Sequence, residues 1–268
     1  MENIYKDMRY NESFSTCYGP KNKCPKTVEI HKDCKYIAQS AFAGESIEKI
    51  ILPKNFDIIG SFAFRNSDLK EINLEDTKTT DIGMCAFYNC KNLKNICAPN
   101  TLKYIKPQAF QSSGLVSINL SNSNLTRIEA VTFAYCHNLC NVSLPKTLIV
   151  INDGAFSDSN ISSLTLPDNL QRFVFDSIFQ TNIEELFIPK SLKEFTSIYY
   201  KITSKEISSL KRIFYTELSD KVKNEINRYI NDNNLDIKFE QTKLDDLIKN
   251  ASTFKQINDF YKKNKEDR

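Results

Sequence analysis

The chain has 268 residues, of which 41% are hydrophobic and 26% are charged, so it is long and apolar enough to bury a substantial core. Its net charge of +3 is small, and the opposite charges balance over the first 200 residues. A broad cationic surface is therefore not expected, and we predict no nucleic-acid partner. No apolar stretch approaches the roughly 18 residues of a membrane-spanning helix, so we expect no membrane insertion.

The first 24 residues are polar and irregular in pattern, with a turn signal at Gly19-Pro20. We interpret residues 1–24 as an N-terminal cap for a repeat array that begins at residue 25, because the ends of such arrays need covering.

Four soft metal ligands lie close together in this region, at Cys17, Cys24, His31 and Cys34. The six-residue gaps between the first three are wider than the two to four residues of a zinc knuckle. Cys34 also falls at a position that is apolar in later repeats. We therefore predict no metal site. A Cys17–Cys24 disulfide and buried free thiols remain open alternatives.

A phenylalanine recurs every 22 or 23 residues through the middle of the chain, and an aliphatic residue precedes each one by five positions. Such a fixed period predicts a solenoid in which each repeat forms one coil. We expect the phenylalanine rings to stack as a spine on the side away from the strands. The phenylalanines are Phe42, Phe64, Phe87, Phe110, Phe133, Phe156 and Phe179.

A short segment with alternating apolar residues also occurs once in each repeat, which predicts a strand with one buried face. Eight copies are in register, so we predict about eight coils whose strands form one parallel sheet. A degenerate ninth copy at Leu210-x-x-Ile213-x-Tyr215 is an open alternative. The eight copies begin at Val28, Ile50, Ile72, Ile96, Ile118, Val142, Leu164 and Leu186.

The segment from Leu139 to Phe156 reads Leu-Cys-Asn-Val-Ser-Leu-Pro-Lys-Thr-Leu-Ile-Val-Ile-Asn-Asp-Gly-Ala-Phe. It resembles the BspA-like (Treponema pallidum-type) leucine-rich repeat, L-x-x-I-x-L-P-x-x-L-x-x-I-x-x-x-A-F. Cys90 and Cys136 lie three residues after a phenylalanine, where that family often carries cysteine. The resemblance covers about residues 25–200 and weakens in the seventh repeat, where Ile178 replaces the usual alanine.

This resemblance implies an α/β solenoid in which a leucine-rich-repeat array over residues 25–202 lines a concave face with one parallel sheet. Residues 203–268 lose the period and contain helical patterns. Ser219 or Asp220 is placed to cap a first helix, and two more are predicted after Thr242 and Ser252. We predict a helical C-terminal extension, either a cap alone or also a partner-binding module.

Catalytic chemistry finds no support in the sequence. The only histidines, His31 and His137, lie several coils apart, and neither has the context of a nucleophile and an orienting group. No glycine-rich phosphate loop is present either. We predict no catalytic residues, no cofactor and no enzymatic activity.

The residues that flank each buried strand position point outward from the predicted concave sheet, and we predict them as the binding surface. The middle of this surface is small, neutral and hydrogen-bonding, with charge and exposed apolar groups at its ends. Ordinary solvated strand residues are the alternative interpretation. The candidates are Lys49, Ile51, Glu71, Asn73, Glu75, Asn95, Ser117, Asn119, Asn141, Ser143, Ser163, Thr165, Glu185 and Phe187.

We therefore predict a non-enzymatic scaffold that binds another protein, with a role in host–microbe interaction implied by the resemblance. A surface adhesin, or anionic-ligand binding through the C-terminal helices, is the alternative. The N-terminus lacks an apolar signal segment, so we expect a cytoplasmic protein, or a secreted or surface one if a signal has been removed. The oligomeric state is left open.

Overall fold

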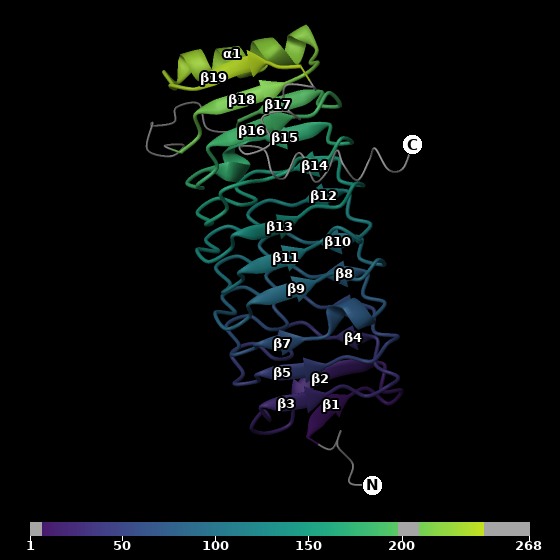
Figure 1. Cartoon of the computed structure of the whole chain (residues 1–268). Helices are drawn as coiled ribbons and strands as arrows, with labels where there is room; N and C mark the ends of the chain where they lie inside the picture. Colours follow the sequence, from purple (N-terminus) through teal and green to yellow (C-terminus); the bar gives the residue numbers. More distant parts are fainter. Residues whose placement is uncertain (1–6, 198–208, 244–268) are drawn as a thin grey trace.

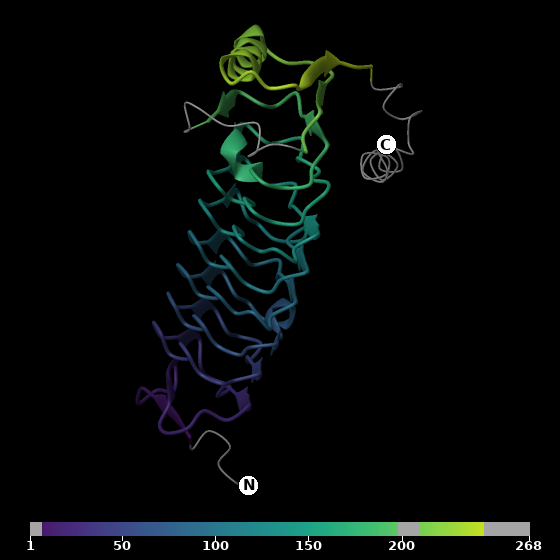
Figure 2. The ribbon, with the colours of Figure 1, turned by 90° about the vertical axis from the view of Figure 1, so that its left-hand side faces the viewer.

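The computed structural model describes residues 7–197 and 209–243. The chain winds into an elongated stack of coils, with the N-terminal coils at one end and the C-terminal coils at the other (Figure 1). Two sides of the stack carry columns of short strands, which are seen edge-on in Figure 2. A third side consists of tight turns that contain the phenylalanines. We call these sides the strand face, the second strand column and the turn side.

The strand face contains the alternating segments predicted from the sequence. Its strands are β3 (Thr27–Glu29), β5 (Lys49–Ile51), β7 (Glu71–Ile72), β9 (Asn95–Cys97), β11 (Ser117–Asn119), β13 (Asn141–Ser143), β16 (Glu185–Ile188), β18 (Arg212–Tyr215) and β19 (Lys238–Gln241). They pair in parallel within three sheets, β3-β5-β7, β9-β11-β13 and β16-β18-β19. The breaks fall at the 3-10 turn η1 (Leu74–Asp76) and at residues 163–165, where no strand forms.

The strand face spans about ten coils, so the prediction of about eight is too low. The degenerate ninth copy is confirmed, because β18 pairs in parallel with β16. A tenth level follows, since β19 pairs in parallel with β18. Its pattern escaped the sequence analysis because a helix separates it from β18 and breaks the 23-residue period.

The second strand column corrects the prediction of a single sheet. The aliphatic residues that precede the phenylalanines also lie on parallel strands, for example Ile59 between Ile37 and Ile82. Most of these strands have only two residues, too few for alternation to reveal them. They are β2 (Thr16–Pro20), β4 (Tyr36–Ile37), β6 (Ile58–Ile59), β8 (Asp81–Ile82), β10 (Tyr104–Ile105), β12 (Arg127–Ile128), β14 (Val150–Ile151), β15 (Arg172–Val174) and β17 (Glu194–Thr196).

The turn side confirms the phenylalanine spine. From Phe42 to Phe156, successive rings stack with centroids 5.0 to 5.5 Å apart and planes within 6 to 14° of parallel. The backbone adopts positive φ two residues before and after the phenylalanine in most coils, as at Gln108 (61°) and Ser112 (59°) around Phe110. The spine ends at Phe156. Phe179 instead meets Phe175 edge-on at 6.2 Å, because the 3-10 turn η2 (Phe175–Ile178) replaces the usual turn.

Serine and cysteine alternate three residues after the phenylalanines, and both are buried. The Cys90 thiol donates to the carbonyl oxygen of Phe64 in the preceding coil at 2.9 Å, and lies 3.6 Å from Ser67 Oγ. The Cys136 thiol donates to the Phe110 carbonyl at 3.1 Å in the same way. These cysteines therefore link neighbouring coils as thiols. All eight cysteines of the chain are free, including Cys17 and Cys24.

The N-terminal segment that we interpreted as a cap contains two strands. Strand β1 (Met8–Tyr10) pairs antiparallel with β2, and β2 pairs in parallel with β4. Strand β2 is therefore the first level of the second column. Cys17 lies in register with Ile37 and is fully buried, so it occupies the inward position that isoleucine takes in later coils.

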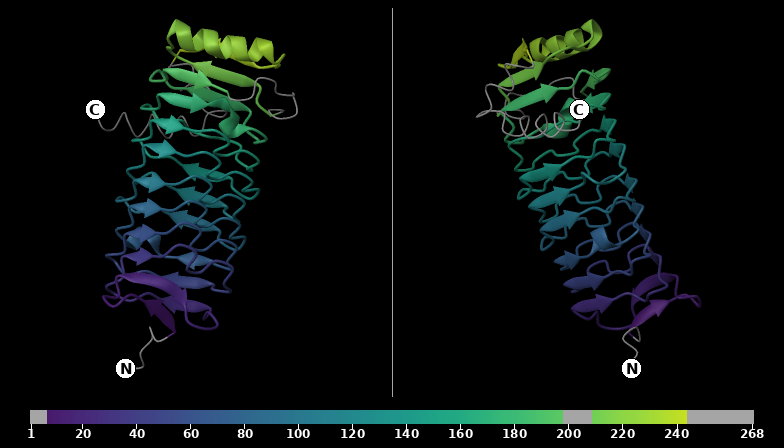
Figure 3. Two further views of the ribbon diagram at one scale, coloured as in Figure 1. Left: turned by 180° about the vertical axis from the view of Figure 1, so that it is seen from behind. Right: turned by 45° about the vertical axis from the view of Figure 1, so that its right-hand side comes forward.

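Helix α1 (Asp220–Asp232) lies across the C-terminal end of the stack (Figure 3). The Ser219 hydroxyl caps it by accepting from the Val222 N–H, as predicted. Its buried face rests on the last coils, and Glu225 accepts a hydrogen bond from the Phe195 N–H of β17 at 3.2 Å. The end is not purely helical, however, because α1 lies between β18 and β19. The two later predicted helices, and the boundary at residue 203, lie outside the described residues.

Replacement of a ring in the middle of the spine tests its contribution to stability. We expect Phe110→Ala to lower the free energy of unfolding by about 3–5 kcal/mol, because it opens a cavity between two stacked rings. Urea unfolding followed by circular dichroism measures the change. Tyr104→Ala, at a side chain that is 51% exposed, is the control. A loss at Phe110 no larger than at Tyr104 would contradict the role of the spine.

Alkylation tests the buried thiols. Burial raises the pKa of the Cys90 thiol to about 11 and that of Cys17 to about 12, so both carry little thiolate at pH 8. We expect iodoacetamide to modify the half-buried Cys140 at least ~100-fold faster than Cys90 in the folded protein. Mass spectrometry at pH 8 resolves the sites, and the difference should vanish in urea. Equal rates in the folded protein would show that Cys90 is accessible.

Candidate binding surface

The strand face presents two rows of outward residues that flank the buried row. Lys49 lies in register with Glu71, and Ser117 lies between Asn95 and Asn141. In the second row, Asn119 lies beside Ser143. Most of the predicted candidates therefore form ladders within each of the three sheets, with side chains repeating at the spacing of paired strands, about 4.8 Å.

Four candidates depart from this arrangement. Asn73 turns back onto its own array, since its side chain accepts from the Leu52 N–H at 2.8 Å and donates to the Leu52 carbonyl at 3.0 Å. Glu75 lies in the turn η1 rather than on a strand. Ser163 and Thr165 lie in the segment that forms no strand. Asn73 thus stabilises the turn after β7 instead of facing a partner.

The middle of the strand face is small, polar and uncharged. Ser117 Oγ donates to Asn95 Oδ1 of the neighbouring strand at 2.7 Å. Asn119 Oδ1 accepts from the hydroxyl of Ser121 at 2.7 Å. The Asn141 amide nitrogen donates to Cys140 Sγ at 3.3 Å. Asn95, Asn119 and Asn141 are all exposed at this surface.

The N-terminal end of the strand face carries an ion-pair network. Lys49 Nζ lies 2.7 Å from a carboxylate oxygen of Glu71. Beside it, Glu48 lies between Lys26 and Lys70, at 2.7 and 2.6 Å, in three successive coils. These two ammonium groups lower the pKa of the Glu48 carboxyl to about 2. This end is therefore a fixed pattern of alternating charges.

The C-terminal end of the strand face carries a second charged cluster, which the sequence analysis found only in part. Glu185 was predicted, and its partner is Arg212 on β18. The Arg212 guanidinium also lies over the Phe214 ring, 5.2 Å from its centroid. A second pair, Lys211 with Glu184, lies alongside at 3.1 Å. The signal that locates Arg212 is the register of the ninth copy, which pairs Arg212 with Glu185.

Exposed large hydrophobic residues lie on the other two sides, which the sequence analysis did not consider as surfaces. Tyr104 is 51% exposed on β10, with the Lys106 ammonium 4.8 Å from its ring centroid. Tyr135 and Met84 are 45% and 42% exposed on the turn side. These positions were missed because only one sheet was predicted, and the rest of each coil was regarded as a connection between its strands.

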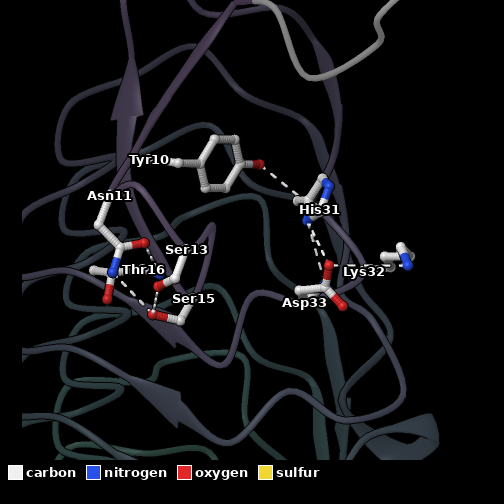
Figure 4. Close-up of polar contacts among 8 residues, drawn as sticks. All are labelled: Tyr10, Asn11, Ser13, Ser15, Thr16, His31, Lys32 and Asp33. Carbon is white, nitrogen blue, oxygen red and sulfur yellow. Dashed lines mark hydrogen bonds and ion pairs between the residues drawn. The ribbon is translucent and has the colours of Figure 1, made fainter.

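His31 packs among aromatic residues at the N-terminal end of the stack. The Tyr10 hydroxyl accepts from the His31 backbone N–H at 3.2 Å (Figure 4). The His31 ring also stacks on Phe14, with centroids 4.5 Å apart. His137 packs near Tyr135, several coils away. Among residues 7–197 and 209–243, no three His, Cys, Asp or Glu side chains are grouped to hold a metal ion. His31 therefore belongs to an aromatic cluster that closes the first coil.

A family profile described as the BspA type leucine rich repeat region, in six copies, matches residues 11–129 and 104–234. The chain belongs to the BspA-type leucine-rich repeat family. The family expected from the sequence is thus confirmed. Leucine-rich repeat proteins generally act as protein-interaction scaffolds rather than as enzymes.

Solved structures similar to this BspA-type protein include a leucine-rich repeat protein from Bacteroides ovatus, at 23% identity and a TM-score of 0.55, over 78% of this chain and 69% of that one. The T. pallidum leucine rich repeat protein is 20% identical, with a TM-score of 0.44 over 56% and 85%. A leucine rich cell surface protein from Faecalibacterium prausnitzii is 14% identical, with a TM-score of 0.47 over 78% and 68%. No curated protein matches the chain.

The likeness to the Bacteroides ovatus protein shows the fold alone. The comparisons give no support to the expectation of a cytoplasmic location. In the part of the chain that the structure describes, no helix has the length and apolar character needed to cross a membrane.

Acidification tests the network around Glu48. Since the folded pKa of about 2 lies below the ordinary 4.5, the carboxylate stabilises the fold above pH 4.5, and this contribution is lost as the pH falls towards 2. We expect the melting temperature of Glu48→Gln to fall less over this range than that of the unchanged protein. Thermal melts from pH 5 to 2 measure the difference.

The matched control for this prediction is Glu12→Gln, which removes an exposed carboxylate that forms no ion pair among the described residues. Molar sodium chloride should reduce the Glu48 effect, because the pairs are open to solvent. Parallel pH profiles for Glu48→Gln and Glu12→Gln would contradict the network.

Proposed function

We propose that this protein is a non-enzymatic scaffold that binds another protein through the strand face. The observation that carries the proposal is the pair of outward ladders, in which side chains from successive coils hold one register over the length of each sheet. Such a surface suits a partner that lies along the stack and contacts several coils at once. Recognition would then rest on shape and on many small contacts rather than on one deep pocket.

The distribution of charge supports a division of roles along this face. The neutral centre around Ser117 and Asn119 offers hydrogen bonds without long-range attraction. The charged ends, at Lys49 with Glu71 and at Glu185 with Arg212, supply electrostatic features that fix the register of a partner. A partner with polar residues at its centre and opposite charges near its two ends fits this pattern.

The helix α1 does not favour the alternative of an anionic ligand at the C-terminal end. Lys221 lies 3.7 Å from Glu225, and Lys223 lies 3.3 Å from Asp220 on the same helix. These cations are locally compensated, so the described helix presents no continuous basic stripe for nucleic acid or an anionic surface.

Charge insertion at the centre of the strand face tests the proposal. We expect the double variant Asn119→Arg/Ser143→Arg to weaken partner binding at least ~tenfold, because two adjacent guanidinium groups would interrupt a neutral contact surface. Affinity capture from the native organism with cross-linking identifies partners, and titration of each purified partner measures the change.

The matched control is Asn122→Arg/Asn138→Arg, which adds the same charge at two exposed residues outside the strands. Equal binding of every captured partner by both double variants would refute the strand face as the contact surface. Truncation after residue 202 is not a suitable variant, because it removes β18, which covers Leu186 and Ile188 of β16.

A further inference from the structure

A solvent-open recess lies on the turn side between the first coils, away from the strand face. Its volume is about 380 Å³, at the lower end of the range for ligand sites in proteins. One cationic, two polar and three small or apolar residues surround it, and none is acidic. The lining residues are Ser40, Ala43, Gly44, Phe62, Arg65 and Asn66.

The recess exists because one coil has small residues where the next coil has large ones. Ala43 and Gly44 directly follow Phe42, whereas Arg65 and Asn66 follow Phe64 in the next coil. A Cβ atom added at Gly44 would meet nothing within 4 Å. Among the residues two positions after the phenylalanines from Phe42 to Phe156, only Gly44 lacks a side chain, so the gap is confined to this coil.

The guanidinium of Arg65 is held at the edge of this gap without a carboxylate partner. It lies 5.8 Å from the ring centroid of Phe62 and 5.3 Å from that of Tyr88, so two aromatic rings set its position. The ion pairs among the described residues include none from Arg65, although Arg127 and Arg172 each have one. Arg65 thus presents an uncompensated and preorganised cation.

Neutral hydrogen-bond donors complete the recess. Asn66 Oδ1 accepts from Asn89 Nδ2 at 2.9 Å, which fixes the amide and leaves Asn66 Nδ2 as a donor. The Ser40 hydroxyl forms no hydrogen bond to another described residue. Glu45 follows Gly44 in the sequence but does not line the recess. Its carboxylate lies near Cys24, since its charge raises the pKa of that thiol. The recess therefore combines one cation with two neutral donors, and no carboxylate lines it.

We propose that this recess binds the carboxylate of an acidic side chain on an extended peptide of a partner protein. A single guanidinium with two neutral donors compensates one negative charge, whereas a phosphate carries about −1.5 to −2 and would be left partly unpaired. The Phe62 ring and Ala43 supply apolar contact for the methylene groups of a glutamate. Because the recess lies on a different side from the strand face, this site stands independently of the function proposed above.

NMR titration tests the site directly. The probe is the peptide acetyl-Gly-Glu-Gly-amide, and acetyl-Gly-Gln-Gly-amide is its neutral counterpart. We expect the acidic peptide to shift the Arg65 Nε–H and Asn66 side-chain signals with saturation and a dissociation constant on the order of 1 mM. The neutral peptide should shift them at least ~tenfold less at the same concentration.

Two variants remove the site in different ways. Arg65→Gln removes the cation, and Gly44→Asn fills the gap with a residue that already occupies the equivalent positions at Asn66 and Asn89, with φ of 59 and 57°. Both should abolish the saturable shifts, Gly44→Asn without loss of melting temperature. Arg127→Gln is the control, because its guanidinium already pairs with Glu129, and it should bind the acidic peptide normally.

The proposal is wrong if both peptides shift the signals equally, or if Gly44→Asn binds the acidic peptide as well as the unchanged protein does. Inorganic phosphate that displaces the peptide at a lower concentration than acetate would also overturn the choice of a carboxylate. Failure here, with strand-face binding intact, would leave the scaffold function untouched.

Discussion

Stacking of each coil on the next is the constraint on which the whole structure depends. A single coil cannot bury its own phenylalanine, because each ring is covered by the rings 5.0 to 5.5 Å above and below it. This spacing is close to the distance between paired strands, about 4.8 Å. The ring stack and both strand columns therefore share one rise per coil. The 22- or 23-residue period follows, since it is the chain length that returns all three sides to register.

The same constraint shapes how the molecule meets a partner. Every outward position repeats at a fixed rise, so the protein offers ladders of similar side chains rather than a moulded cavity. Specificity then comes from the places where a ladder is interrupted. The paired charges around Glu48 and Arg212 interrupt the neutral strand face, and Gly44 interrupts the side-chain ridge beside Arg65. The residues that depart from the repeat therefore distinguish one position along the stack from another.

The sequence predicts the repeated parts of this fold well, because each depends on a residue that recurs in register. The Phe42–Phe156 spine and the alternating strand segments are of this kind. The Ser219 cap was found differently, from a local helix-start pattern outside the repeats. The second strand column was missed because two-residue strands such as Tyr36–Ile37 leave no alternation to read. The tenth coil was missed because helix α1 interrupts the period before Phe239. For the candidate surface, outward direction followed from alternation, but the inward turn of Asn73 depends on a contact with Leu52 that no periodicity encodes.

The seventh coil departs from the repeat on two of the three sides of the stack. There the strand face has no strand at residues 163–165, and the ring stack ends between Phe156 and Phe179. The second column crosses the same level without a break, because β14 pairs with β15 and β15 with β17. The turn side also keeps backbone hydrogen bonds across this level, from the Phe156 N–H to the Ser177 carbonyl at 2.7 Å and from the Asp158 N–H to the Phe179 carbonyl at 2.9 Å. The last three coils, with their Arg212 cluster, are therefore joined to the first six through the second strand column and the turn side rather than through strand pairing on the strand face.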